Sequence, residues 1–274
     1  MRGEFVEVGG RRIYYYAAGS RGPGVPIVLL HGFPTSSRLW HAVVRDFPEG
    51  HRLVIVDLPG YGRSELGDLD ADCTTQAKAL VRLLDDLRIP AACLVGHGAG
   101  GGVAQRLAVE HPARVSHLAL LDSAAFGVAP RRMAGLARRL AGIAGWGPSA
   151  LLAGLVHGSV LAGFAVPERS RLTLDTCLQP FTTPAGRDVL RRHLRALGRC
   201  DTVDATARLG ALGIPTAILW GADDPFYPVA LAHRLQAAVP HATLDILEGA
   251  RHFVPEDAPD RVIARLVELV GRPR

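Results

Sequence analysis

Short, continuous runs of apolar residues recur along the first half of the chain, and each run ends at a glycine or an aspartate. The runs are VPIVLLHG (25–32), HRLVIVDLPG (51–60), AACLVG (91–96) and RVSHLALLDS (114–123). Strands that are buried on both faces show this continuous pattern, because helices cover a parallel sheet on either side. The runs therefore predict buried strands of a parallel sheet. Two further β-like stretches, at 4–8 and 11–19, precede them.

Segments with helical spacing separate the apolar runs. CTTQAKALVRLLDDLRI (73–89) places Leu80, Leu83 and Leu87 on one face, as an amphipathic helix does. GGVAQRLAVEHP (101–112) predicts the next helix. Alternating strands and helices imply an α/β protein whose parallel sheet has helices on both faces. Ligands of such sheets bind beyond the carboxyl ends of the strands.

The pattern changes at residue 124, where a stretch rich in glycine, alanine and leucine begins. No clear strand is predicted until PTAILWG (215–221), after which strand and helix patterns alternate again. We expect a core formed by residues 1–123 and 209–274, interrupted by a helical insert at 124–208. Because the insert follows a strand end, we expect it to form a cap over the carboxyl edge of the sheet.

Composition excludes several classes of function. The 274 residues are 48% hydrophobic with a mean hydropathy of +0.17, which is enough to bury a large core. No apolar run is long enough for a transmembrane helix, and the N-terminus has no apolar region typical of a signal peptide. The net charge of +5 comes mainly from arginine. No nucleic-acid motif accompanies it, so we expect neither a nucleic-acid nor a membrane partner.

Cysteine and cofactor patterns narrow the expectation further. The four cysteines are widely spaced and match no metal-binding motif, so we expect reduced thiols and a cytoplasmic protein; they are Cys73, Cys93, Cys177 and Cys200. The sequence has no dinucleotide fingerprint, P-loop or metal cluster, and we expect no cofactor and no metal. The oligomeric state is left open, a homodimer included.

The stretch LVGHGAGGG (94–102) carries the first sign of chemistry. It predicts a buried strand that enters a glycine-rich turn and then a helix. In enzymes with the G-x-S-x-G nucleophile elbow, the middle residue of such a turn carries the attacking side chain. The corresponding residue here is Gly98, which has no side chain. A covalent intermediate at this position is therefore impossible.

Five ordered pieces of the chain resemble the α/β-hydrolase superfamily over nearly its whole length. They are HGFPTSS, DLPGYGRS, GHGAGG, WGADDPFYP and GARHFVPED, and each follows a predicted strand. The resemblance implies the α/β-hydrolase fold, a mostly parallel central sheet flanked by helices, with a helical cap insert. The motif HGFPTSS is most similar to the branch that holds haloalkane dehalogenases and epoxide hydrolases.

The resemblance also implies roles for individual residues. Asp224 is the expected catalytic acid, with Asp223 and Asp122 as alternatives, and His252 is the expected base. An aspartate on one imidazole nitrogen fixes the tautomer and increases the basicity of the other nitrogen. The backbone N–H groups of Phe33 and Ala99 would form an oxyanion hole.

Other family-like positions are not expected to be catalytic. His31 and His97 are interpreted as residues that brace loops through hydrogen bonds. Four serines lie outside the elbow, so we interpret them as helix caps and turn hydroxyls rather than substitute nucleophiles; they are Ser36, Ser37, Ser64 and Ser123.

Two branches of the family use further catalytic residues, besides the nucleophile, that this chain does not have. Haloalkane dehalogenases hold the leaving halide with an asparagine and a tryptophan, and this chain has Phe33 and Ala99 at those positions. Epoxide hydrolases protonate the epoxide with cap tyrosines. All five tyrosines of this chain lie outside the predicted insert; they are Tyr14, Tyr15, Tyr16, Tyr61 and Tyr227.

The insert indicates the kind of substrate. It is apolar in its middle, and we name Phe126, Trp146 and His157 as candidate substrate-binding residues, together with Phe226 beside the expected acid. A lid of this kind suits a bulky apolar or aromatic small molecule. The alternative is that these side chains simply pack the cap on the core.

Three functions remain open at this point. The first is non-hydrolytic catalysis by the His–Asp pair and the oxyanion hole, such as cyclisation, C–C bond formation or cleavage, isomerisation or elimination, in specialised metabolism. The second is a hydrolase, esterase-like or similar to dehalogenases and epoxide hydrolases, in which Gly98 is an engineered replacement of the nucleophile. The third is a non-catalytic ligand receptor.

Overall fold

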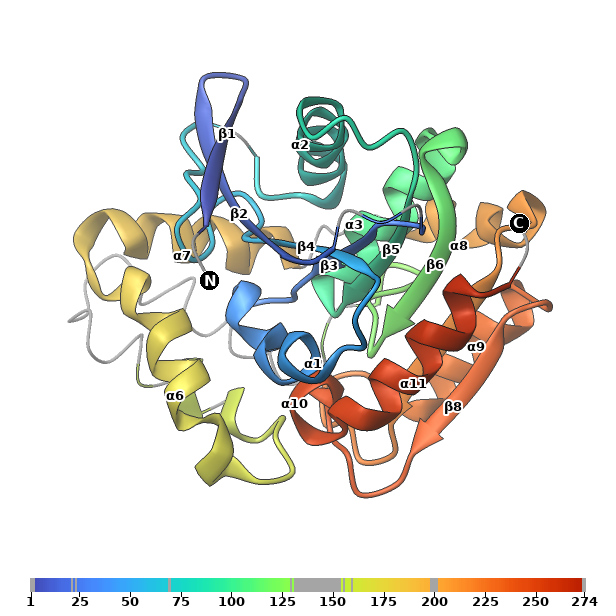
Figure 1. Cartoon of the computed structure of the whole chain (residues 1–274). Helices are drawn as coiled ribbons and strands as arrows, with labels where there is room; N and C mark the ends of the chain where they lie inside the picture. The colour runs from blue at the N-terminus through green and yellow to red at the C-terminus, as the bar shows by residue number, and fades with distance from the viewer. Residues whose placement is uncertain are drawn as a thin grey trace.

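A central sheet of eight strands organises the molecule, with helices on both faces (Figure 1). This computed structural model describes residues 3–20, 22, 24–68, 70–128, 130, 154, 156–158, 160–197 and 202–272. The candidate substrate-binding residue Trp146 lies outside the described residues.

The sheet is antiparallel at one end and parallel over the rest. β1 pairs with β2, and β2 with β4, in antiparallel fashion, and every later pairing is parallel. In spatial order the strands are β1 (Glu4–Val8), β2 (Arg11–Gly19), β4 (Arg52–Val56), β3 (Ile27–Leu30), β5 (Ala92–His97), β6 (Val115–Leu121), β7 (Thr216–Gly221) and β8 (Thr243–Leu247). The predicted α/β class and its mostly parallel sheet are confirmed.

Helices pack on the two faces of this sheet in separate groups. One group has α1, α10 and α11, which contact one another and lie at the front of Figure 1. The other has α2, α3, α8 and α9, with α3 against β5 and β6. Their bounds are α1 (His41–Asp46), α10 (Val254–Asp257), α11 (Pro259–Val270), α2 (Cys73–Asp86), α3 (Ala99–Glu110), α8 (Val203–Leu209) and α9 (Val229–Ala238).

The elements described between β6 and β7 are helical. Besides α8 they include α6 (Pro167–Leu178), the short helix η3 (Gln179–Thr182), α7 (Pro184–Leu197) and η4 (Gly210–Leu212). Helix α6 packs on η1 (Ser37–Trp40), which follows β3, and the expected cap Ser36 accepts the Arg38 N–H there. The boundaries of the cap stay a prediction.

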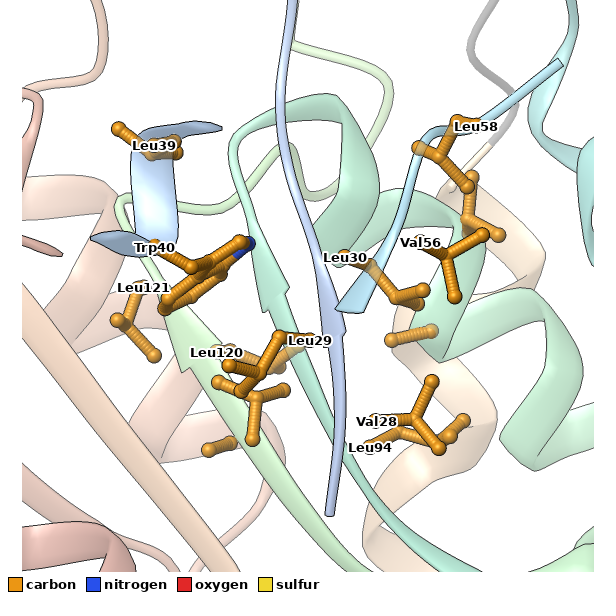
Figure 2. Packing of buried hydrophobic residues seen from close by; sticks show 14 of the residues in the cluster. Val28, Leu29, Leu30, Leu39, Trp40, Val56, Leu58, Leu94, Leu120 and Leu121 are labelled. Atoms are coloured by element: carbon orange, nitrogen blue, oxygen red, sulfur yellow. The ribbon is translucent and has the colours of Figure 1, made fainter. Parts of the chain in front are cut away.

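Large apolar side chains from several elements meet in the core. Figure 2 shows Leu29 of β3 near Leu120 of β6, with Trp40 above them. All three side chains are fully buried. Burial of a leucine contributes ~1.5–3 kcal/mol relative to exposure, so this layer holds β3 and β6 in a fixed relation.

The strand register determines where the functional residues lie. Leu30 pairs with Gly96, and His97 pairs with Leu121, so β3, β5 and β6 end at the same edge. Gly221 at the end of β7 pairs with Leu247 at the end of β8. The segments that leave these strands, including the Gly98 turn and the loop of His252, therefore emerge side by side.

One sequence prediction about cysteine is wrong. Cys73 is disulfide-bonded, whereas Cys93 and Cys177 are free and buried. Wide spacing in the sequence conceals such a pair, because folding alone decides which cysteines meet. Four reduced thiols can therefore no longer be used as an argument that the protein is cytoplasmic.

A membrane-spanning element is not found in the described part of the chain. None of its helices is both long enough and apolar enough to cross a bilayer.

Candidate active site

The turn at Gly98 has the geometry of a nucleophile elbow. Gly98 has φ of +53° and ψ of −121°, and α3 begins at the next residue. Its N–H donates to Leu121 O, and its carbonyl accepts the Ala124 N–H, which ties the turn to β6 and the segment that follows β6. A positive φ is uncommon for any residue with a side chain and marks a strained position.

Neighbouring glycines make this sharp turn possible. A Cβ atom on Gly96 would lie 2.6 Å from Gly100 O, and one on Gly100 would lie 2.4 Å from His31 O. Both distances are shorter than real Cβ contacts, so strand, turn and helix pack closely only with glycine at these positions. The GHGAGGG pattern is thus required by the elbow whether or not a nucleophile is present.

His252 and Asp224 form the hydrogen-bonded pair expected from the sequence. Nδ1 of His252 lies 2.9 Å from Oδ2 of Asp224, and their side chains are 5% and 0% exposed. A carboxylate only accepts hydrogen bonds, so Nδ1 carries a proton, and in the neutral ring Nε2 has a free lone pair. Nε2 lies 3.6 Å from the position that a Cβ atom on Gly98 would take.

Backbone donors hold Asp224 in place. Its Oδ1 accepts the N–H of Phe226 at 2.7 Å and that of Tyr227 at 3.1 Å. The alternative acid Asp223 is exposed. The other alternative, Asp122, is fully buried and accepts the Gly221 N–H at 2.8 Å rather than the His252 proton.

The two expected oxyanion donors border the same cavity as the base. Phe33, Gly98, Ala99 and His252 line one small pocket. Ala99 opens α3, and the first N–H groups of a helix have no acceptor within it. The helix dipole adds to their attraction for negative charge. The cavity can therefore stabilise an oxyanion close to His252.

Aromatic rings surround the base. The ring centroids of Phe226 and Phe253 each lie 4.9 Å from that of His252, both in edge-to-face contact. Phe164 stacks on Phe253 at 4.1 Å. The cavity wall is therefore mostly apolar, which suits an aromatic or aliphatic ligand and strengthens electrostatic interactions inside it.

Of the four candidate substrate-binding residues, Phe226 lines this cavity. Phe126 instead lies beneath the guanidinium of Arg234, with 3.9 Å between its ring centroid and the Arg234 Cζ. His157 Nε2 lies 3.9 Å from Oδ1 of Asp175 on α6. Neither Phe126 nor His157 is among the described residues that line the cavity, and their roles in binding stay predictions.

His31 and His97 are held by backbone bonds. His31 Nε2 accepts the Leu58 N–H, and His97 Nε2 donates to the carbonyl of His252; both distances are 3.0 Å. Burial lowers the pKa of both histidines, so both rings are neutral. These bonds fit the bracing roles expected from the sequence.

Two of the four serines make bonds that exclude a role at the elbow. Ser64 Oγ donates to Asp57 O, and Ser123 Oγ donates to Ala124 O. Neither hydroxyl is bonded to His252, whose Nδ1 is taken by Asp224.

Three side chains here each bring one possible metal ligand atom within 4.8 Å of the others: His97, Asp122 and His252. One nitrogen of each histidine is already engaged, by a carbonyl for His97 and by Asp224 for His252. These hydrogen bonds position the ring of His252 and do not require a metal. The expected absence of a metal stays a prediction.

Sequence reasoning missed His193. It is buried on α7, where its ring stacks on Tyr61 with 3.8 Å between centroids. Burial lowers its pKa to about 3. With Ala99 it lines a second small pocket beside the first. Its burial could have been predicted from the sequence, because His193 lies on the apolar face of a helix with Leu190 and Leu194.

Comparison with known proteins identifies the family. A model described as the alpha/beta hydrolase family matches residues 27–265. The chain therefore belongs to the alpha/beta hydrolase family. Membership indicates an enzyme, most often a hydrolase.

Individual relatives agree with this assignment over most of their length. An uncharacterized protein of Mycobacterium tuberculosis is 30% identical over 98% of this chain and 80% of its own. Haloalkane dehalogenase 2 of Mycobacterium bovis is 29% identical over 95% of this chain and 92% of its own. The crystal structure of an alpha/beta hydrolase fold protein from Burkholderia ambifaria has a TM-score of 0.86 at 28% identity, with 97% of each chain covered.

Proposed function

We propose that the protein is an enzyme of this family that works without a covalent nucleophile. His252 is its general base and acid, and the N–H groups of Phe33 and Ala99 form its oxyanion hole. The observation that carries this proposal is Gly98, a glycine at the elbow that faces an intact His252–Asp224 pair. The reactions that fit are isomerisation, elimination, cyclisation, or C–C bond formation or cleavage.

The mechanism begins with a proton transfer. Nε2 of His252 removes a proton from a C–H or O–H group of a substrate in the cavity, and Asp224 stabilises the imidazolium that forms. Negative charge that develops on a substrate oxygen is stabilised by the two backbone N–H groups. One such donor changes the rate by ~10²–10³-fold. His252 then returns the proton to the product or to the leaving atom.

Gly98 contributes space to this reaction. A serine or aspartate side chain at the elbow would stand between the base and the substrate. With glycine, a substrate atom can approach Nε2 directly, in the region where a Cβ atom would lie 3.6 Å away. The apolar wall formed by Phe226 and Phe253 then favours an apolar or aromatic molecule.

A second candidate is a hydrolase in which glycine replaces the natural nucleophile. It is favoured by the room at the elbow, because the nearest atom to a Cβ on Gly98 is the Gly32 Cα at 3.5 Å, an ordinary contact. The haloalkane dehalogenase relative supports a hydrolytic ancestry. Phe33 and Ala99 offer backbone donors, which favours an ester over a haloalkane.

The Kemp elimination of 5-nitrobenzisoxazole tests the proposed chemistry directly. In this reaction a base removes one C–H proton, the N–O bond breaks, and the product is a coloured phenolate, so no nucleophile is required. We expect turnover that is lost in His252→Ala. His233→Ala, on the exposed face of α9, is the matched control and should keep the rate. Equal rates in wild type and His252→Ala would show that His252 is not a base.

A further inference from the structure

Asp122 lies at the end of β6, close to His252, and the proposed mechanism gives it no role. It is fully buried, and its φ of +42° is one that Asp and Asn adopt more readily than most residues. Oδ1 accepts the Gly221 N–H. Oδ2 is buried and has no N–H or O–H donor in the described part of the chain.

A second carboxyl group lies next to Asp122. The side chain of Asp122 interacts with that of Asp224, and Asp122 and His252, the partner of Asp224, each place a polar atom within 4.8 Å of the other. Two ionised carboxylates can only accept hydrogen bonds, and they repel each other in a buried site. A bond between them therefore requires that one of them holds a proton.

The donors around the two carboxyl groups decide which one is protonated. Asp224 already accepts three hydrogen bonds, from the Phe226 N–H, the Tyr227 N–H and the His252 Nδ1–H, and three donors stabilise an anion. Asp122 accepts a single N–H. The proton therefore belongs on Asp122.

Other charged groups near Asp122 do not change this assignment. Burial and the negative charges of Asp224 and of Asp257 on α10 raise the pKa of Asp122 well above its usual range, and the Gly221 N–H opposes them. His97 and His252 each place a ring nitrogen within 4.8 Å of its carboxyl group. Burial keeps His97 neutral, so it supplies no positive charge to ionise Asp122.

We propose that Asp122 is a neutral carboxylic acid that donates its Oδ2 proton to the carboxylate of Asp224, and so acts as a positioning residue for the His252–Asp224 pair. With this bond, donors from three separate segments surround Asp224, and its carboxylate cannot rotate away from His252. The positioning role rests on the proposed function, because it requires His252 to be the base. The proton on Asp122 does not depend on any reaction.

Infrared difference spectroscopy of the full-length protein, labelled with ¹³C at aspartate side-chain carboxyls, tests the proton. Near neutral pH we expect the C=O band of a protonated carboxylic acid, lost in Asp122→Asn. It should persist in Asp245→Asn, which removes a carboxylate paired with Arg265. Absence of the band in wild type, or its persistence in Asp122→Asn, would overturn the proposal. Failure of the Kemp reaction with the band intact would refute the proposed function alone.

Two substitutions then test the positioning role. Asn at 122 keeps a group that can donate to Asp224 and accept from Gly221, whereas Gly tolerates the positive φ but removes both bonds. We expect Asp122→Asn to keep the Kemp rate within about threefold, and Asp122→Gly to lose about tenfold or more. The Nδ1–H proton resonance of His252 should shift in Asp122→Gly alone. Loss of rate in both variants would show that Asp122 works as an anion, and no loss in either would remove its role.

Discussion

The Nε2 atom of His252 lies 3.6 Å from the position where a Cβ atom on Gly98 would stand, and among the described residues no other side chain is nearer to that position. The ring of His252 is thus directed at the side-chain position of the elbow residue. The elbow itself is preserved, since Gly98 keeps the positive φ of such turns. A serine side chain can therefore be introduced at 98 without rebuilding its surroundings.

Gly98→Ser should create an esterase. We expect a burst of p-nitrophenol from p-nitrophenyl butyrate and an acyl-enzyme mass, with a rate about 10³-fold or more above Gly98→Ala. Gly98→Ala is the matched control, because both side chains impose the same strain of about 1–3 kcal/mol at a positive φ. A rate no higher in the serine than in the alanine variant would show that the site is not arranged for acyl transfer.

Asp122→Asn should stabilise the protein as pH rises. Burial raises the pKa of Asp122 above its usual 3.8, so its contribution to folding is full below pH 3.8 and is lost as pH rises through the folded-state pKa. Each pH unit in that window corresponds to about 1.4 kcal/mol. Thermal melts should agree at about pH 4 and favour the variant by several degrees at about pH 8. A constant difference across this range would contradict the raised pKa.

His193→Phe should reduce acid sensitivity. Burial lowers the pKa of His193 from 6.5 to about 3, so the stability it contributes is present above pH 6.5 and is lost as pH falls toward 3. The loss between pH 6.5 and about pH 5 is on the order of 2 kcal/mol. Phenylalanine can keep the stack on Tyr61 without titrating. Urea unfolding at several pH values should give a shallower decline for the variant, and parallel declines would contradict the prediction.

Gly163→Ala should destabilise the fold and disturb the base. A Cβ atom at 163 would lie 2.6 Å from the Phe226 ring and 2.7 Å from that of Phe253, and overpacking of this kind costs about 1–3 kcal/mol. Gly158→Ala is the control, because a Cβ there meets nothing within 4 Å. Thermal melts and the Kemp rate measure both effects. Equal stability of the two variants would show that the rings move aside.

The fold could be predicted from the sequence because its signals are local. Apolar runs such as Ile27–Leu30 and residues 118–121, bounded by glycine or aspartate, indicate buried strands. The ordered motifs at the strand ends then predict the family. The parallel register brings those ends to one edge, so the pairing of His252 with Asp224 followed from the topology.

The remaining features depend on contacts between distant segments, which composition and spacing do not encode. The disulfide of Cys73 needs a partner brought close by folding. The burial of His193 depends on how α7 meets Tyr61. The contact between Asp122 and Asp224 also has no local signal, because either residue alone fits the position of a catalytic acid. Each of these is set by tertiary packing.

The carbonyl of Gly163, which precedes α6, accepts the N–H groups of both His252 and Phe253, at 2.9 and 3.2 Å. Asp257 adds a second link, since its carboxylate accepts the N–H groups of Ala165 and Arg251. The loop that carries His252 is therefore fastened to the segment that leads into α6. A chimera that exchanges this segment with that of a relative would have to replace these acceptors as well, or it would release the histidine. Any change of the segment before α6 is therefore also a change in how the proposed base is held.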